Sequence, residues 1–573
     1  MSNRKIGVYI CHCGGNISDY VDVEKVREAV AGEPGVVVAK TAMFTCSDAT
    51  QQEMFQDIKE QGLDGLVVAS CSPKLHLFTF RGVAKRAGLN PYQYTQVNIR
   101  EQCSWTHTDD PAGATEKAIR LVRAGIARTN LTEPLEPIVV NTVPGVLVVG
   151  AGVAGLRAAV GLADLGLSVW LIEKSPVPGG WVAGFGRMYP HEQNGARLIE
   201  QLVGEVKKRR NITLFTNAEL VEKSGSIGDF NVVMRVNGGE QIKANVGAVI
   251  VATGFDAYQP GDGEYGYGTD GVITLPEFKA LVDAANGRLV YNGREVKDVV
   301  YIYCVGSRQP EGEERTYCSR YCCNAAVHAS LTALEKDPGL HQFHLFRDIR
   351  TYGKFELLYN QSREMGVRYL KFDENEPPVV EKDTTGKVKV TVRDLLTYGE
   401  EVEIRADLVV LVTGMVPRRN SDLTDVLKLP VGRDGFYNEI HPKLRPVETV
   451  VDGVFICGAC QGPKNSAESV ASALAAVTQS ASILKKGYVE LEPLIAAVNP
   501  ERCQWCGECE SACPYAAIVR EEFQGKEIAA VNRAVCKGCG GCAPICPQHA
   551  IDLKGYTDAQ IRSMIDAFVK EAV

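Results

Sequence analysis

The C-terminal part of the chain contains two copies of one cysteine motif, C-x2-C-x2-C-x3-C-P. This spacing is typical of ferredoxins with two [4Fe–4S] clusters, in which the fourth cysteine of each copy ligates the cluster of the other copy. The expected ligand sets are Cys503, Cys506, Cys509 and Cys546 for one cluster, and Cys536, Cys539, Cys542 and Cys513 for the second. Zinc is the alternative, but C-P repeats at this spacing suit a cubane better than paired tetrahedral sites. The motif therefore predicts an electron-transfer module.

A second group of cysteines lies in the middle of the chain, in the segment Y-C-S-R-Y-C-C and just before it. Its members are Cys304, Cys318, Cys322 and Cys323. Four thiols within 20 residues, two of them adjacent, suit an iron–sulfur cluster of distorted geometry. Buried free thiols are the alternative.

A third group follows the expected strands of the N-terminal region. Strands are expected near 8–10, 41–45, 66–70 and 96–99, and they are followed by Cys11, Cys46, Cys71 and Cys103. Because ligands gather outside the carboxyl ends of strands in an open α/β sheet, these thiols should converge and hold one further cluster. Cys13 is an alternative ligand, and His12 is expected beside the cluster or at the surface. A row of small core residues is the other interpretation.

A glycine fingerprint, G-x-G-x-x-G, follows the apolar strand 146–149 and predicts a dinucleotide site. Its glycines allow a tight turn and close approach of the pyrophosphate to a helix N-terminus near residue 153. An acid, Glu173, follows the next strand and is placed to bind a ribose hydroxyl. The expected cofactor-binding residues are Gly150, Gly152, Gly155, Glu173, Lys174, Gly179, Gly180, Thr253, Gly254, Gly414 and Gly458.

Three later segments favour FAD over NAD at this site. Strand 249–254 ends in A-T-G, segment 408–414 repeats that ending closely, and segment 454–458 is followed by a small-residue helix from Ser466. Together these segments resemble the thioredoxin-reductase-like flavoproteins, which carry two dinucleotide folds. The second fold here starts at strand 299–304, and its turn keeps Gly306 but lacks the other glycines. We therefore expect a cluster near the flavin in this fold and no pyridine nucleotide.

Composition excludes other classes of protein. The chain has 573 residues, a net charge of −8 and 19 cysteines, and the acidic balance argues against nucleic-acid binding. No apolar run approaches the length of a membrane span, and the N-terminus lacks a signal-peptide pattern, so we expect a cytoplasmic protein without a disulfide framework.

The expected fold class is α/β in the first two parts of the chain and α+β in the ferredoxin part. The expected domains are an N-terminal α/β iron–sulfur domain at 1–135, an FAD-binding Rossmann-type domain at 142–291 and 400–490, an inserted Rossmann-like domain at 292–399, and a ferredoxin domain with a C-terminal helix at 496–573. A helix at 115–128 should close the first domain.

Several motifs resemble those of the A-type subunits of heterodisulfide reductase over essentially the whole chain. They are C-H-C-G-G-N-I at 11–17, A-S-C-S-P-K-L-H at 69–76, N-I-R-E-Q-C-S-W-T-H at 98–107, Y-C-S-R-Y-C-C at 317–323 and G-A-C-Q-G-P-K at 458–464. The resemblance implies an anaerobic redox complex in which FAD can split electron pairs. It implies subunits similar to heterodisulfide reductase B and C, hydrogenase- or dehydrogenase-type donors and ferredoxin as partners, and a dimer within that complex. By position, Cys460, Lys464 and His328 are the expected flavin neighbours.

The chain departs from the family pattern at two points. It has no cysteine between Cys103 and Cys304, so the inserted ferredoxin domain of methanogen members is missing. Members that split electron pairs carry a lysine where this chain has His328, and histidine is only partly charged near neutral pH. A plain electron relay, such as in complexes of sulfate reducers or anaerobic aromatic degraders, is therefore the alternative, and a structural hub is a third.

If all four cluster sites are filled, protein prepared without oxygen should contain about 16 iron atoms per chain, from four irons per [4Fe–4S] cluster. Iron and sulfide analysis checks this number. A content of about eight irons would leave only the ferredoxin clusters.

Loss of the nucleotide-binding glycines predicts that NADH does not reduce the flavin of the isolated protein stoichiometrically. An anaerobic titration followed by flavin absorbance tests this, with dithionite as the positive control. Full bleaching by one equivalent of NADH would contradict the expectation.

Overall fold

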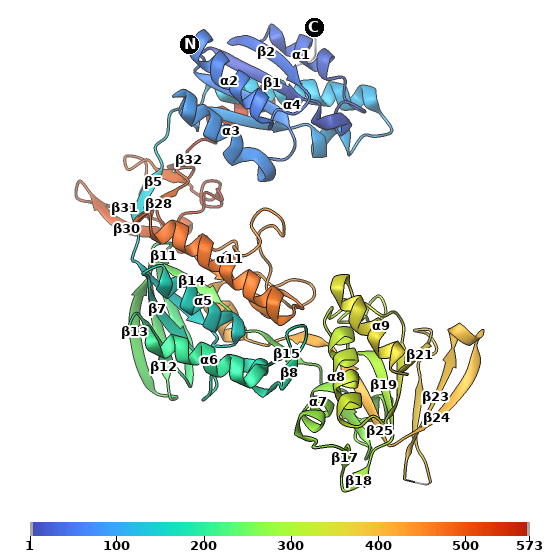
Figure 1. The fold of residues 1–573 in the computed structure, drawn as a ribbon. Helices are drawn as coiled ribbons and strands as arrows, with labels where there is room; N and C mark the ends of the chain where they lie inside the picture. The colour runs from blue at the N-terminus through green and yellow to red at the C-terminus, as the bar shows by residue number, and fades with distance from the viewer. Residues whose placement is uncertain (1–3, 385, 570–573) are drawn as a thin grey trace. The chain divides into compact units, whose positions relative to one another are not determined.

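The computed structural model, drawn as a ribbon in Figure 1, describes residues 4–384 and 386–569. Its chain divides into two compact units. One unit combines residues Met1–Val140 with Glu490–Val573, and the other spans Asn141–Val489. In the part of the chain that is described, no helix is long and apolar enough to cross a membrane.

The N-terminal region is a parallel four-stranded sheet with the order β2-β1-β3-β4. Its strands are β1 (Ile6–Cys11), β2 (Val36–Ala42), β3 (Gly65–Ser70) and β4 (Tyr94–Asn98). Its helices are α1 (Val23–Ala31), α2 (Asp48–Gln61), α3 (Pro73–Ala87) and α4 (Pro111–Asn130). Strands β1 and β3 are buried at every position, as expected of parallel strands covered on both faces.

Alternate residues of β1 enter different cores. Ile6, Val8 and Ile10 pack with residues of α1 and α4, whereas Tyr9 packs with residues of α2 and α3. The sheet therefore has two helices on each face, and only its ends are open to loops. This arrangement directs the cysteine-bearing loops to the carboxyl edge.

The ferredoxin region is a small α+β module in the same unit. Strand β29 (Ala496–Val498) pairs antiparallel with β32 (Ile551–Leu553), and β30 (Ile518–Phe523) forms a hairpin with β31 (Lys526–Val531). The helix α13 (Asp558–Val569) then packs against α4. Residues 570–573 of the expected tail lie outside the described residues.

A buried arginine joins the tail to the N-terminal sheet. Arg128 Nη2 donates to the carbonyl oxygen of Gly555 at 2.9 Å, and Nη1 donates to Thr95 Oγ1 at 3.0 Å. The guanidinium lies 4.1 Å from the ring centre of Tyr556. The N-terminal and C-terminal regions of the sequence therefore form one unit.

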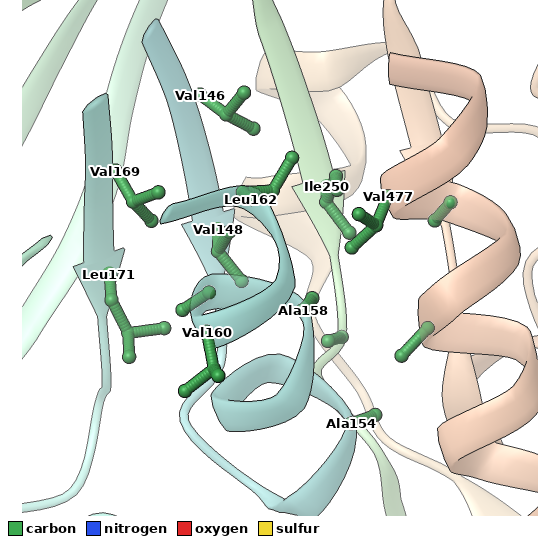
Figure 2. Packing of buried hydrophobic residues seen from close by; sticks show 14 of the residues in the cluster. Val146, Val148, Ala154, Ala158, Val160, Leu162, Val169, Leu171, Ile250 and Val477 are labelled. Carbon is green, nitrogen blue, oxygen red and sulfur yellow. The ribbon is translucent and has the colours of Figure 1, made fainter. Parts of the chain in front are cut away.

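The second unit contains a parallel five-stranded sheet with the order β10-β7-β6-β14-β27. The glycine fingerprint comes directly after its central strand, β6. Its strands are β6 (Gly145–Val149), β7 (Ser168–Ile172), β10 (Ile212–Phe215), β14 (Ala248–Val251) and β27 (Val454–Ile456). Helices α5 (Val153–Asp164) and α11 (Ser466–Leu484) pack together beside it, and α6 (Gly195–Lys208) packs on α5. Figure 2 shows Ala158 and Leu162 of α5 near Val148 of β6, with Val477 of α11 beside them. Small residues on both helices permit this close contact.

A second parallel sheet has the order β16-β25-β19-β20-β21. Its strands are β16 (Val272–Thr274), β19 (Asp298–Val305), β20 (His341–Phe346), β21 (Arg368–Lys371) and β25 (Leu408–Thr413). Helices α7 (Leu275–Ala284), α8 (Cys322–Lys336) and α9 (Glu356–Glu364) accompany it. Strands β16 and β25 lie outside the range 292–399 that we expected for the inserted domain. The buried parallel strands of both sheets have the same sequence pattern, a short apolar run. The pattern therefore does not predict which of the two sheets such a strand joins.

Two antiparallel sheets flank these parallel sheets. One consists of β11 (Ala218–Ser226), β12 (Asp229–Val236) and β13 (Glu240–Val246), and the other of β22 (Val379–Lys382), β23 (Val388–Asp394) and β24 (Glu400–Ala406). Helix α10 (Ser421–Leu427) follows β26 (Met415–Pro417).

Candidate functional site

A cavity of about 1390 Å³ opens at the carboxyl ends of β6, β7 and β14. It exceeds the roughly 300–1,000 Å³ of ordinary small-molecule pockets, which suits an extended dinucleotide. Of the predicted cofactor-binding residues, those that line it are Gly150, Gly152, Glu173, Lys174, Gly179, Gly180, Thr253 and Gly254.

The glycine fingerprint accepts no side chain at two of its positions, Gly150 in the loop after β6 and Gly155 in the first turn of α5. A Cβ at Gly150 would lie 2.5 Å from the carbonyl oxygen of Ala252, and one at Gly155 would overlap the carbonyl oxygen of Gly150. Gly152 faces open space, with no atom within 4 Å of its Cβ position. The N-terminus of α5 is therefore open to the cavity, as binding of a pyrophosphate requires.

The acid after β7 holds this loop in place. Glu173 Oε2 accepts a hydrogen bond from the backbone N–H of Ala151 at 2.7 Å, and Oε1 accepts from the N–H of Ser175 at 2.9 Å. The carboxylate is thereby fixed at the cavity wall, where a ribose hydroxyl would reach it.

Three buried polar atoms at the cavity have no hydrogen-bond partner among the described residues. They are Thr253 Oγ1, Asn324 Oδ1 and Asn420 Nδ2, and all three residues line the cavity. Buried polar atoms are normally paired, so these atoms fit the polar edges of a bound FAD. Thr253 was predicted from the sequence, whereas Asn324 and Asn420 were not, because only the tertiary structure brings them to the cavity.

The predicted flavin neighbours differ in their placement. Lys464 lines the cavity, where burial lowers its pKa, and its Nζ lies 3.2 Å from Gln461 Oε1. Cys460 is buried behind the wall, with its Sγ 3.1 Å from the carbonyl oxygen of Cys457. Gly414 and Gly458 also lie outside the lining, and Gly458 instead allows close packing against Ala154.

His328 lines the cavity from α8 and is 7 % exposed. Its Nε2 lies 3.1 and 3.2 Å from the two carboxylate oxygens of Glu192, and that carboxylate also pairs with Arg187 Nη2 at 2.8 Å. Burial lowers the pKa of His328, and this outweighs the opposing effect of Glu192. The imidazole is therefore neutral at neutral pH.

The structure brings the four cysteines of the second sheet together. Cys304 lies at the end of β19, Cys322 and Cys323 begin α8, and Cys318 lies in the loop between them. A hydrogen bond with Cys323 and burial raise the pKa of Cys322, and the charges of Cys304 and Cys318 raise it further. Cys304 has a left-handed backbone, with φ at +62°. Such strain is common where a side chain must be aimed at a ligand.

Four cysteines of the N-terminal sheet also influence one another, and this group contains Cys13, the alternative ligand, together with Cys11, Cys46 and Cys71. Burial raises the pKa of Cys46 and raises that of Cys71 to about 11, and the charges of Cys11 and Cys13 add to both shifts. Thr45 N donates to Cys11 Sγ at 3.4 Å. Thr45 Oγ1 is buried without a hydrogen-bond partner among the described residues. Buried polar atoms are normally paired, so this atom fits a site that holds a further polar group.

Cys103 is not among the charged groups that act on Cys46 and Cys71, although it lies in the same hydrophobic cluster as Cys11 and Cys13. It is fully buried against α4, burial raises its pKa to about 11, and Lys117 is the charged group that acts on it. The reason is the π-helical turn η2 (Arg100–Ser104), which follows β4 and carries Cys103 past the carboxyl edge into the core. The geometry thus favours Cys13 over Cys103 as the fourth ligand.

The ferredoxin cysteines accept backbone hydrogen bonds at three positions. Ala529 N donates to Cys503 Sγ at 3.2 Å, and Ala517 N and Ala550 N donate to Cys513 and Cys546 at 3.3 Å. Donors to cluster sulfurs raise the reduction potential by stabilising added negative charge. No three His, Cys, Asp or Glu side chains within residues 4–384 and 386–569 are arranged to hold a single metal ion.

Comparisons with known proteins identify two regions of the chain by family models. The family described as FAD dependent oxidoreductase matches residues 145–227, and the 4Fe-4S dicluster domain matches residues 502–550. The chain is 37 % identical to the second A-type iron-sulfur subunit of CoB–CoM heterodisulfide reductase from Methanopyrus kandleri, over 91 % of this chain and 92 % of that protein.

Other relatives and solved structures are similar to smaller degrees. The A-type subunit of the H2:CoB-CoM heterodisulfide,ferredoxin reductase of Methanothermobacter marburgensis is 36 % identical over 91 % of both chains. Thioredoxin reductase of T. acidophilum aligns with 59 % of this chain and 97 % of its own, at 20 % identity and a TM-score of 0.42.

The placement of the N-terminal thiols predicts different outcomes for two serine variants. Cys71→Ser should lower the iron content by about four atoms, because four irons make one [4Fe–4S] cluster. Cys103→Ser should leave the iron content unchanged, since that thiol faces α4. Iron analysis and EPR of both proteins provide the comparison, and loss of iron in both variants would restore the original ligand set.

Proposed function

This chain belongs to the family of heterodisulfide reductase A-type subunits, and from that premise we propose that it is the electron-transfer subunit of a heterodisulfide-reductase-like complex. It is an oxidoreductase with an FAD domain and a [4Fe–4S] dicluster domain. In the proposed complex, partner subunits similar to heterodisulfide reductase B and C carry out the chemistry on the substrate. A hydrogenase- or dehydrogenase-type subunit, or ferredoxin, supplies the electrons.

One observation carries this proposal. The cavity that fits FAD is lined by Tyr321, Asn324 and Ala325, and these residues flank the adjacent thiols Cys322 and Cys323. The start of α8 therefore contributes to the cofactor cavity and to the thiol group at the same time. We infer that a cluster held there exchanges electrons with the flavin directly.

The protein's own residues define the environment of the cofactor. The α5 N-terminus and the glycine loop would hold its pyrophosphate, and Trp181, whose indole N–H donates to Phe255 O at 3.0 Å, forms part of the wall. FAD supplies the exchange between two-electron and one-electron steps. Lys464 and Lys279 are two partly buried cations of the cavity lining, whereas His328 on α8 is neutral.

We propose that this flavin splits electron pairs between two acceptors. A cluster at Cys304, Cys318, Cys322 and Cys323, beside the cavity, would offer one path for electrons, and the remaining clusters would offer others. A simple relay is the second candidate function. Two features favour the relay. His328 is neutral, whereas members that split pairs carry a fixed cation at this position, and the inserted ferredoxin domain is missing.

Spectroelectrochemistry of the purified flavoprotein distinguishes the two functions. Splitting of pairs predicts crossed one-electron potentials, with the second electron entering more easily than the first. A relay predicts normally ordered potentials and a persistent flavin EPR signal at intermediate potentials. That second result would exclude the splitting of pairs.

Two variants of one residue test how the cavity charge acts on the flavin. His328→Lys should raise the two-electron flavin potential by about 30 mV or more, which is a tenfold change in equilibrium. His328→Gln should match the unmodified protein at pH 7, because the imidazole is already neutral there, and the two should diverge only as the pH falls below the ordinary histidine pKa. Equal potentials for all three proteins would place His328 too far from the flavin to act on it.

A further inference from the structure

We propose that Arg100 raises the reduction potential of the N-terminal iron–sulfur site and that Glu101 opposes it. The inference rests on the proposed cluster at Cys11, Cys13, Cys46 and Cys71. It concerns two residues that touch or adjoin these thiols, and it assigns them opposite effects on the same electron acceptor.

The guanidinium of Arg100 lies against the thiols. Its Nη1 donates to Cys13 Sγ at 3.4 Å, and its side chain is only 14 % exposed. Of the charged groups that act on Cys71, Arg100 has the largest effect, and it opposes the rise in pKa that burial causes. The cation is therefore near two of the proposed ligands.

The π-helical turn η2 explains why Arg100 points this way. Its wide turn is closed by hydrogen bonds from Trp105 N to Arg100 O at 2.9 Å and from Ser104 N to Ile99 O at 3.1 Å. Residues five apart become neighbours in such a turn. The guanidinium accordingly stacks on Trp105, 4.5 Å from the ring centre.

Glu101 holds the other edge of the guanidinium. Its Oε1 accepts from Arg100 Nη2 at 2.7 Å and from Nε at 3.3 Å, and Glu101 N donates to Asn98 Oδ1 at 3.1 Å. The planar fork is thus oriented between a carboxylate and a thiol, which a lysine ammonium could not reproduce. In this ion pair the Arg100 guanidinium contacts Cys13, and the Glu101 carboxylate lies on the other edge of the guanidinium.

The sign of each effect follows from charge. Adding an electron to a cluster increases its negative charge, so a nearby cation stabilises the reduced state and raises the potential. A carboxylate does the reverse. Because the site is largely buried, solvent and salt screen both effects only weakly. Because Arg100 stays protonated at all accessible pH values, its contribution does not depend on pH.

Another ion pair of the same domain provides a matched control. Arg123 Nε on α4 pairs with Glu33 Oε1 at 2.6 Å, with both side chains partly exposed. Arg123→Gln removes the same charge from the same domain, and neither residue of this pair is among the groups that act on the cysteines.

The test is a redox titration of the full-length protein followed by EPR. The difference between the spectra of the unmodified protein and Cys71→Ser identifies the N-terminal signal. Arg100→Gln should lower its one-electron reduction equilibrium about tenfold, which is about 59 mV. Glu101→Gln should raise its potential, Arg100→Lys should fall between Arg100→Gln and the unmodified protein, and Arg123→Gln should leave it unchanged. The ferredoxin signals should not move in any variant.

The outcomes separate this inference from the proposal on which it rests. If Cys71→Ser changes neither the iron content nor the spectrum, the N-terminal cluster is absent and both fail. If the cluster is present but Arg100→Gln and Glu101→Gln shift its potential in the same direction, or not at all, the inference alone is overturned. Should Arg100→Gln fail to assemble the cluster, Glu101→Gln and Arg100→Lys still decide the sign.

Discussion

Parallel sheets buried on both faces impose the main constraint on this protein. Strands such as β1, β3, β6 and β19 are buried along nearly their whole length, so polar or reactive groups can emerge only where the strands end. The glycine loop after β6, the cysteine at the end of β19 and the thiols around β1 and β3 all lie at such carboxyl ends. The flavin cavity and the two thiol groups at these sheets therefore rest on a rigid apolar support, with loops and helix starts providing the contacts to a cofactor.

Burial has an electrostatic consequence at each of these edges. It raises the pKa of the proposed ligands Cys71 and Cys542 to about 11, so these cysteines are protonated at neutral pH unless something stabilises the thiolate. Iron in a bound cluster does so, because metal binding and thiol deprotonation are coupled. Backbone donors and the Arg100 guanidinium add smaller contributions at particular sulfurs. The protein can thus give clusters of one chemical type different potentials through their neighbours.

The charges of the side chains that line the flavin cavity differ from one wall to the other. Lys464 is a cation at one wall, while His328 is kept neutral by burial although it contacts a carboxylate. Asn324 and His328 both belong to α8, and the same helix begins with two thiols of the adjoining group. One helix therefore connects the electrostatics of the flavin with those of its nearest proposed electron acceptor.

The local sequence alone was enough to identify the ferredoxin module, the FAD fingerprint and the order of the main elements, because fixed cysteine spacings and short apolar runs between glycine turns depend on neighbours along the chain. Strand β19 and helices α4, α5 and α11 occur where those patterns predicted them. What only the tertiary structure decided depends on contacts between distant segments. These include the membership of β25 in the second sheet, the burial of Cys103 at the turn η2, the position of Cys460 behind the cavity wall, and the placement of Asn324 and Asn420 in the cavity lining. A residue's type determines what chemistry it can perform, but the direction in which its side chain points is set by the packing of elements that the sequence places far apart.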